Sequence, residues 1–220
     1  MSYYILTSDG RTVLALKNDD KNDKIYAVNN SGELTGKSLE ISTDFMHSKE
    51  TFAVNTKRDG PQTIDVYSTN DKSAATSFFK FAAQNTNVEW SQTNTHDLNY
   101  NPDYGFDNNM SFIGTTHQQG FDVSSSFIAN SKNNGLMKRP NHMTNSTYLD
   151  ECIHSHDNGS LRASDADVNF AEKVSNRYVT ARFFTYSFIT NGYLEYSRYS
   201  EKGIHSLGEV TIPGIHKKKK

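Results

Sequence analysis

The chain has 220 residues, a formal net charge of −2 and a single cysteine, Cys152. The near-neutral charge gives no general electrostatic case for a nucleic-acid binder, whose footprint is usually a basic face. One cysteine excludes an intramolecular disulfide and a cysteine-rich zinc module. Hydrophobic residues make up only 35% of the sequence, but 13 Phe and 12 Tyr supply large apolar areas, so a packed core is expected.

The sequence has no recognisable targeting or membrane segment. No stretch approaches the roughly 18 consecutive apolar residues of a membrane-spanning helix, so no membrane span is expected. The start, MSYYILTSDGRT, lacks the basic residues and the apolar run of a secretory signal. The run HKKKK at 216–220 is interpreted either as a basic interaction tail or as a solvated, disordered end left from cloning.

Residues 1–72 are expected to form a β-rich N-terminal extension. Runs of β-branched and aromatic residues alternate with turn-forming residues such as Asp9-Gly10. These runs predict strands at 3–7, 12–17, 24–29 and 62–69. This part of the sequence contains no chemical motif.

Residues 73–220 are expected to form one mixed α+β domain. Apolar residues at helical spacing predict a helix at 73–86, with Ser73 as its N-cap. The remaining pattern predicts strands at 87–93, 110–117, 121–129 and 147–156, polar loops at 94–110 and 130–147, a helix at 164–178, and a hairpin of 178–190 and 193–200 around Asn191-Gly192.

The stretch HSHDNGSLRASDAD at 154–167 has two interpretations. In the first, the histidines end a strand, and Ser164 with Asp167 forms a capping box that starts a helix. In the second, His154 and His156 project from the same strand face about 6–7 Å apart, which suits two imidazoles on one zinc ion. Asp167 would then be the third ligand, and a fourth position would stay open for water, as in catalytic zinc sites.

The same stretch resembles the signature of the JAMM (JAB/MPN) metallopeptidase family. His-x-His, seven residues, Ser, two residues and Asp are matched by His154, His156, Ser164 and Asp167 with the spacing intact. The resemblance covers about residues 73–220 and implies a central mixed sheet flanked by helices. It further implies a Zn²⁺ ion held by the two histidines and the aspartate, with Ser164 stabilising the oxyanion of the reaction.

The family also places a glutamate upstream, on a strand after the first helix, as general base and acid. Glu89 follows the predicted helix directly and precedes His154 by 65 residues, so the resemblance assigns this role to Glu89. The alternative for Glu89 is a solvent-facing strand carboxylate. Glu151 precedes His154 by three residues and is expected on the opposite strand face, as a surface or edge carboxylate.

One residue departs from the family pattern. Asp157 stands where the family has a proline directly after the second histidine. Proline fixes φ and stiffens the turn, whereas aspartate places a second carboxylate near the metal. That carboxylate is expected to add a ligand, to close the open position or to weaken the Lewis acid, and it leaves the activity of this chain open.

The remaining histidines and the cysteine are expected to have no catalytic role. His47, His96, His117, His142 and His205 show no ligand spacing and are expected on the surface or in the core. Cys152 shares the strand face of His154 and is expected to be a small buried residue.

The resemblance implies hydrolysis of amide or isopeptide bonds in a protein or peptide substrate. A β-rich extension before a JAB-like domain also resembles the C-terminal toxin modules of bacterial polymorphic and Rhs-type effectors. That likeness implies a delivered effector without a classical signal peptide, acting in the cytoplasm of a target cell, with an immunity protein as partner.

Three other functions compete with the metallopeptidase. A zinc deaminase is excluded, because its signature needs a Cys-x-x-Cys pair. A metal-dependent nuclease toxin would need a basic groove, for which the sequence offers only the terminal lysines. The third alternative is a catalytically inactive JAB-fold binding domain.

Overall fold

The structure is a computed structural model that describes residues 1–18, 21–56, 60–97, 109–118, 147–176 and 178–197. The predicted strand at 121–129, residues 98–108 of the predicted loop at 94–110 and residues 130–146 of the predicted loop at 130–147 lie outside these residues. So do His142, His205 and the lysine run at the C-terminal end. The prediction of a loop at 94–97 and 109–110 was wrong, because these residues belong to strands.

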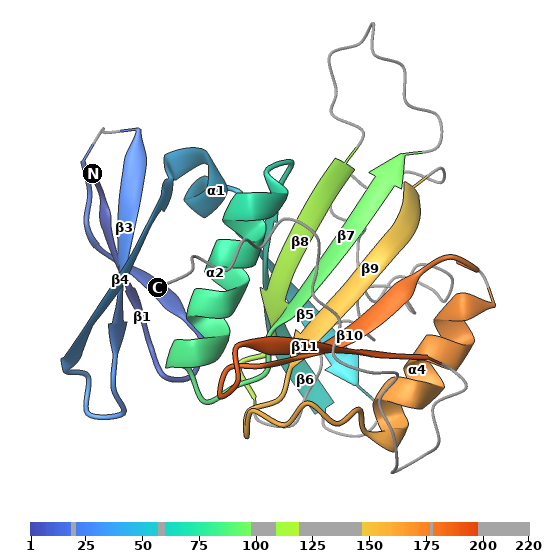
Figure 1. Cartoon of the computed structure of the whole chain (residues 1–220). Coiled ribbons are helices and arrows are strands. Elements are labelled where there is room, and N and C mark those ends of the chain that lie inside the picture. The colour runs from blue at the N-terminus through green and yellow to red at the C-terminus, as the bar shows by residue number, and fades with distance from the viewer. Residues whose placement is uncertain (19–20, 57–59, 98–108, 119–146, 177, 198–220) are drawn as a thin grey trace, which may run out of the picture.

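The described residues form two β-sheets and three helices (Figure 1). A four-stranded sheet has the order β2-β1-β3-β4, with β1 at Tyr3–Leu6, β2 at Thr12–Leu16, β3 at Asn22–Val28 and β4 at Leu34–Ser42. A seven-stranded sheet has the order β11-β10-β9-β7-β8-β6-β5. Its strands are β5 (Glu50–Thr56), β6 (Gly60–Thr69), β7 (Ser91–Asp97), β8 (Asn109–Thr115), β9 (Thr147–Ser155), β10 (Arg182–Ser187) and β11 (Gly192–Tyr196). The helices are α1 (Thr43–His47), α2 (Lys72–Asn85) and α4 (Asp165–Ser175).

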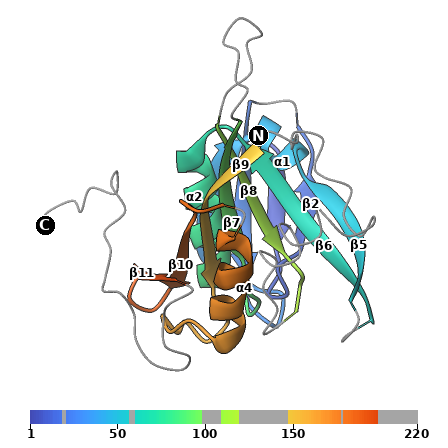
Figure 2. The ribbon, with the colours of Figure 1, turned by 90° about the vertical axis from the view of Figure 1, so that its right-hand side faces the viewer.

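Alternation along the strands gives the seven-stranded sheet two apolar faces, each covered by a helix (Figures 1 and 2). Ile153 of β9 belongs to the cluster that contains Phe78 and Phe79 of α2. Its neighbour Cys152 belongs to the cluster that contains Phe170 of α4. Because adjacent strand residues point to opposite faces, this division places α2 and α4 on opposite sides of the sheet. The predicted mixed α+β fold with a central sheet flanked by helices is confirmed.

The four-stranded sheet shares a core with α2 rather than standing apart. Leu6, Ile25 and Ile41 are buried in the same cluster as Phe78 and Trp90. Figure 1 shows α2 between the four-stranded sheet and strands β7 and β8. The division into 1–72 and 73–220 stays a prediction; in the structure β5 and β6, which precede residue 73, are part of the seven-stranded sheet.

Several elements follow the sequence prediction closely, and three were missed. Strand β9, helix α4 and the β10–β11 hairpin lie where the sequence predicted them. Helix α2 begins at Lys72, and its N-cap is Asp71 instead of Ser73, because the Asp71 carboxylate accepts bonds from the N–H groups of residues 73 and 74. Strand β4, α1 and β5 were not predicted.

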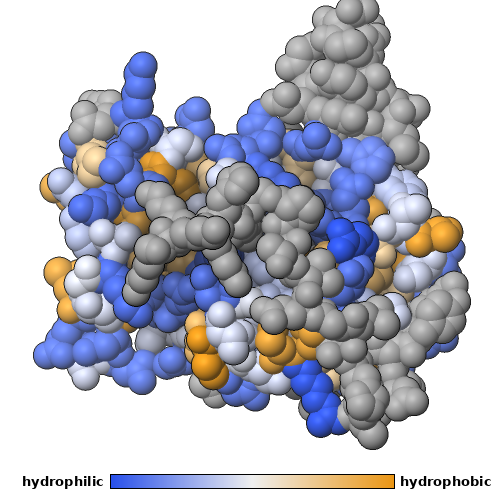
Figure 3. All heavy atoms as spheres, in the orientation of Figure 1, coloured by the Kyte–Doolittle hydropathy of each residue, from blue (hydrophilic) through white to orange (hydrophobic). Residues whose placement is uncertain are grey.

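The outer surface agrees with the polar composition. On the face seen in Figure 3, hydrophobic side chains form small patches between hydrophilic ones. The exposed large hydrophobic residues within the described part of the chain are Val13, Leu14, Leu16, Leu34, Val179 and Ile189.

Candidate metal centre

Strand β9, an interior strand of the seven-stranded sheet, carries His154, and His156 lies just beyond its end. The strand pairs with β10 in parallel and with β7 in antiparallel orientation, and His154 lies opposite Thr185 on one side and Ser91 on the other. His154 points to the face covered by α4, the same face as Cys152. His156 follows the last residue of the strand on that same face. The predicted burial of Cys152 is confirmed, since only 1% of it is exposed.

Helix α4 brings Asp167 to the histidines from its first turn. Ser164 is the N-cap, and its Oγ accepts a bond of 3.2 Å from the N–H of Asp167. In return, the N–H of Ser164 donates to Oδ2 of Asp167 at 2.6 Å. The capping box and the convergence of Asp167 on the histidines therefore occur together, and the bond from Ser164 orients the carboxylate.

The three side chains meet at one point. Nε2 of His154 lies 3.1 Å from Nε2 of His156 and 3.3 Å from Oδ1 of Asp167, and Nε2 of His156 lies 3.3 Å from Oδ2 of Asp167. Ligands about 2.0–2.1 Å from a tetrahedral zinc ion stand about 3.3 Å apart, so this donor set fits zinc. Among the described residues, these are the only three or more His, Cys, Asp or Glu side chains whose ligand atoms all lie within 4.8 Å of one another.

The protonation of two donors suits a cation. Burial alone would raise the pKa of Asp167, but the neighbouring His154, the bonds to both histidines and the Ser164 N–H hold that pKa far below its usual range. Nδ1 of His156 lies 3.1 Å from the carbonyl oxygen of Ser160, which can only accept. This contact suits a hydrogen on Nδ1, so that a metal replacing the hydrogen between Nε2 and Asp167 would meet the lone pair of Nε2.

Glu89 lies beside this group but does not belong to it. It sits two residues before β7, not within a strand as predicted, and only 7% of it is exposed. Trp90 accepts a bond of 2.8 Å from the N–H of Ser155 and donates one of 3.1 Å to the Ser155 hydroxyl. The antiparallel register of β7 and β9, continued past these bonds, puts Glu89 opposite His156 on the face of the histidines. Its role as general base stays a prediction.

Asp157 and Glu151, two other carboxylates near the histidines in the sequence, lie outside the donor group. Asp157 is in the turn after His156, and its carboxylate is not among the donors that converge. Glu151 points to the α2 face, as predicted, where Oε2 binds Lys72 at 2.6 Å and Asn94 at 2.9 Å. It is more buried than a surface or edge carboxylate, because β9 is an interior strand and 12% of the side chain is exposed.

One histidine has a structural role that sequence reasoning missed. His117 follows β8, and its ring contacts Asp65 of β6 and the Asp9 carbonyl of the β1–β2 turn. These contacts join segments more than 50 and 100 positions apart in the sequence, so no local spacing could signal them. His47 is exposed at the end of α1. His96 is partly exposed, and its Nδ1 lies 2.6 Å from the Asp150 carboxylate.

Comparison with known proteins gave a match to one family model. Residues 67–172 match the family model described as JAB-like toxin 1. The match begins in β6, ends in α4, and includes Glu89, His154, His156 and Asp167. Searches among curated proteins and among solved structures gave no match. No helix in the described part of the chain is long and apolar enough to cross a membrane. The donor group of His154, His156 and Asp167 thus lies within the matched segment, and the match supports a JAB-like toxin domain in this chain.

Proposed function

We propose that the chain is a zinc-dependent hydrolase of amide or isopeptide bonds and acts as a toxin on a protein or peptide. The observation that carries this proposal is the convergence of two imidazole nitrogens and one carboxylate at 3.1–3.3 Å from one another. A zinc ion held by His154, His156 and Asp167 would supply Lewis acidity and lower the pKa of a coordinated water to about 7.

The side chains around the donor group suit the remaining roles. Glu89 would accept a proton from the attacking water and later return it to the leaving amine. Its position beside His156 but outside the donor group supports a base rather than a fourth ligand. The Ser164 Oγ accepts from the Asp167 N–H, so its own hydrogen remains available to donate to a developing oxyanion.

The match to a toxin family also supports a proposal for where the protein acts and what neutralises it. A toxin domain is consistent with a delivered effector that acts in the cytoplasm of a target cell and that its producer neutralises with an immunity protein. Both the delivery and the immunity partner are part of this proposal.

The test uses proteins of a bacterial lysate whose amines have first been blocked by acetylation. Hydrolysis of any amide or isopeptide bond then creates a free amine, which is labelled and located by mass spectrometry. We expect the zinc-loaded chain to release amines, and the chelator-treated chain to release none until zinc is restored. No zinc-dependent release, together with no growth arrest on cytoplasmic expression in a bacterium, contradicts the proposal.

Glu89→Gln is the matched variant, since it keeps the size of the side chain and removes the base. We expect zinc content and melting temperature to stay near wild type, and the rate of amine release to fall about 10²-fold or more. Unchanged turnover in this variant would move the base to another residue.

A further inference from the structure

The turn between β1 and β2, residues 7–11, lies directly against the segment that carries Glu89. The N–H of Asn87 donates to the Ser8 carbonyl at 2.8 Å. Gly10 has a φ of +82°, and a Cβ placed on it would stand 2.8 Å from Cγ2 of Val88 and 3.3 Å from Cζ2 of Trp90. The turn therefore contacts both chain neighbours of Glu89, and only glycine leaves room for that contact.

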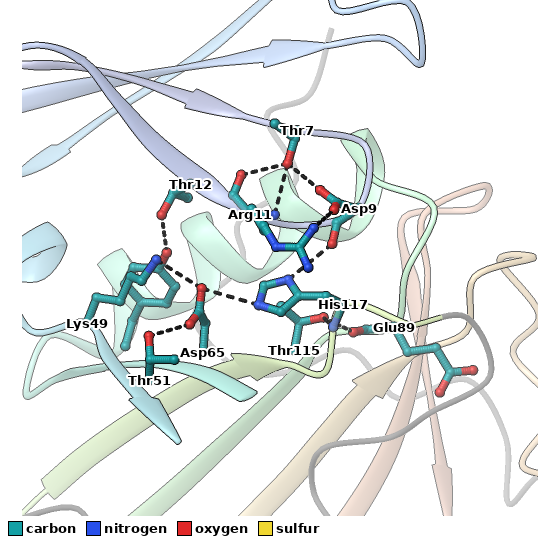
Figure 4. A network of polar contacts seen from close by, with 11 residues as sticks. Thr7, Asp9, Arg11, Thr12, Lys49, Thr51, Asp65, Glu89, Thr115 and His117 are labelled. Atoms are coloured by element: carbon teal, nitrogen blue, oxygen red, sulfur yellow. Dashed lines mark hydrogen bonds and ion pairs between the residues drawn. The ribbon is translucent and has the colours of Figure 1, made fainter. Parts of the chain in front are cut away.

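His117 ties the same turn to the seven-stranded sheet (Figure 4). Its Nδ1 lies 3.1 Å from the Asp9 carbonyl, and its Nε2 lies 3.2 Å from Oδ2 of Asp65. Both partners are acceptors, so both bonds form only when each ring nitrogen carries a hydrogen. The backbone φ of His117 is +59°, a conformation that costs a non-glycine residue energy and persists where surrounding contacts enforce it.

Thr115 continues the contact from His117 to Glu89. Its hydroxyl accepts from the N–H of His117 at 3.1 Å and donates to the carbonyl of Glu89 at 2.9 Å. Thr115 is fully buried. Figure 4 shows the Glu89 carbonyl at the edge of this network while its carboxylate points away from it.

On its other side the Glu89 segment is fixed to the histidine strand. Hydrogen bonds join Trp90, the residue after Glu89, to Ser155, the residue between His154 and His156. The backbone of Glu89 is thus held from two directions, by β9 and by the β1–β2 turn with His117 and Thr115.

We propose that the β1–β2 turn, together with His117 and Thr115, is a positioning element. It fixes the backbone of Glu89 and thereby the position of the Glu89 carboxylate relative to the donor group. The four-stranded sheet then completes the catalytic site although it lies outside the segment that matches the toxin family. This inference rests on the proposed role of Glu89 in hydrolysis. The contacts described above connect the three positioning parts to the Glu89 segment and to Asp65, so their loss should lower turnover without releasing zinc.

The first test compares Gly10→Ala with Gly32→Ala in the full chain. Gly32 has a φ of +79° and nothing within 4 Å of an added Cβ, so it reproduces the backbone strain without the contact. Trp90 is the single tryptophan and is fully buried next to Glu89, so its fluorescence reports on this segment. We expect Gly10→Ala to shift the Trp90 emission to the red, increase its quenching by acrylamide and lower amine release at least tenfold. Gly32→Ala should match wild type in emission, quenching and turnover, and both should bind one zinc.

The second test removes a single hydroxyl. Thr115→Val keeps the shape of the side chain and loses the bond to Glu89, whereas Thr115→Ser keeps the bond. We expect Thr115→Val to lower the maximal rate of amine release with unchanged zinc affinity, and Thr115→Ser to restore most of that rate. A purely structural contribution would lower stability in both variants without this difference between them.

The outcomes separate the two proposals. If wild type releases no amines, the hydrolase proposal fails, and the Trp90 emission of Gly10→Ala still decides whether the turn holds the segment. If wild type is active but Gly10→Ala equals Gly32→Ala in emission and turnover, or Thr115→Val equals Thr115→Ser, the positioning proposal is overturned. Loss of zinc in Thr115→Val would also overturn it, because the effect would then act through the donor group.

Discussion

Asp157 is the second residue of a turn in which the Gly159 N–H donates to the His156 carbonyl at 3.0 Å. The second position of such a turn favours proline, because φ there is close to the value that the ring imposes and the N–H has no role in closing the turn. The departure from the family pattern therefore leaves the turn itself intact, with Gly159 at a φ of +69° completing it.

We expect Asp157→Pro to be tolerated and to raise stability by about 0.4–1 kcal/mol, because proline restricts the unfolded chain. The donor group does not include Asp157, so zinc stoichiometry should be unchanged. Removing a negative charge beside the site should raise turnover or growth inhibition. Thermal unfolding, zinc analysis and amine release check the three parts. Loss of zinc in this variant would show that Asp157 acts in the metal site.

At the scale of secondary-structure elements, the buried carboxylate of Asp65 links β6, in which it lies, to β5 and β8. Its carboxylate, 7% exposed, lies 2.9 Å from Lys49 before β5 and 3.2 Å from His117 after β8, and it accepts from Thr51 of β5 at 2.6 Å. Burial alone would raise the pKa of Asp65, but the bonds from His117, Thr51 and Lys49 hold it well below its usual range.

A lowered pKa in the folded state fixes the sign of the pH dependence. The stabilisation is present above the unfolded-state pKa of about 4 and is lost as the pH falls towards the folded-state pKa. We expect Asp65→Asn to melt well below wild type at pH 7, and the difference between their melting temperatures to narrow below about pH 4. Measuring the difference cancels the contribution of Asp167, whose pKa is lowered in both proteins. A constant difference across this range would mean that the charge of Asp65 contributes nothing.

The sequence predicted those elements whose signals are local. The histidine spacing, the capping box at Ser164 and the turn at Asn191-Gly192 each act within 14 residues, and the structure has β9, α4 and the β10–β11 hairpin there. Strand β4 was missed because its sequence, LTGKSLEIS, is polar and mostly exposed, so it lacks the alternation of a half-buried strand. The contacts of His117 could not be predicted, because they depend on the pairing of β6 with β8 and on where the β1–β2 turn docks.

For the whole molecule, the donor group predicts a coupling between zinc and stability. A ligand that binds the folded state at about 100 times its dissociation constant adds about 2.7 kcal/mol. For a chain of this size that corresponds to a rise in melting temperature of roughly 5–10 °C. We expect added zinc to produce this shift in wild type and in Glu89→Gln, but not in His154→Ala. The melting curves of the three proteins with zinc and with chelator check it, and an equal shift in His154→Ala would place zinc elsewhere.

The shared core predicts that the matched segment cannot stand alone. Deleting residues 1–66 would remove Leu6, Ile25 and Ile41 from a cluster that also contains Phe78 and Trp90 of the remaining chain. We expect the fragment 67–220 to expose this apolar surface, to lack a cooperative thermal transition and to bind a hydrophobic dye. A fragment that melts cooperatively near the temperature of the full chain would show that the four-stranded sheet, α1, β5 and most of β6 are dispensable for folding.

The three donor residues lie close together in the sequence, whereas the proposed base, Glu89, lies far from them. His154 and Asp167 are 13 positions apart, so closing their loop costs little entropy, whereas Glu89 reaches them from 65 positions upstream and is held by a turn at residues 7–11. A refolding chain could therefore assemble the proposed metal site early, before the strands that place Glu89 have paired. Under the proposed function, metal binding and catalytic competence would be separate events during refolding, and a chain that has bound zinc would become active only after residues 7–11 have docked.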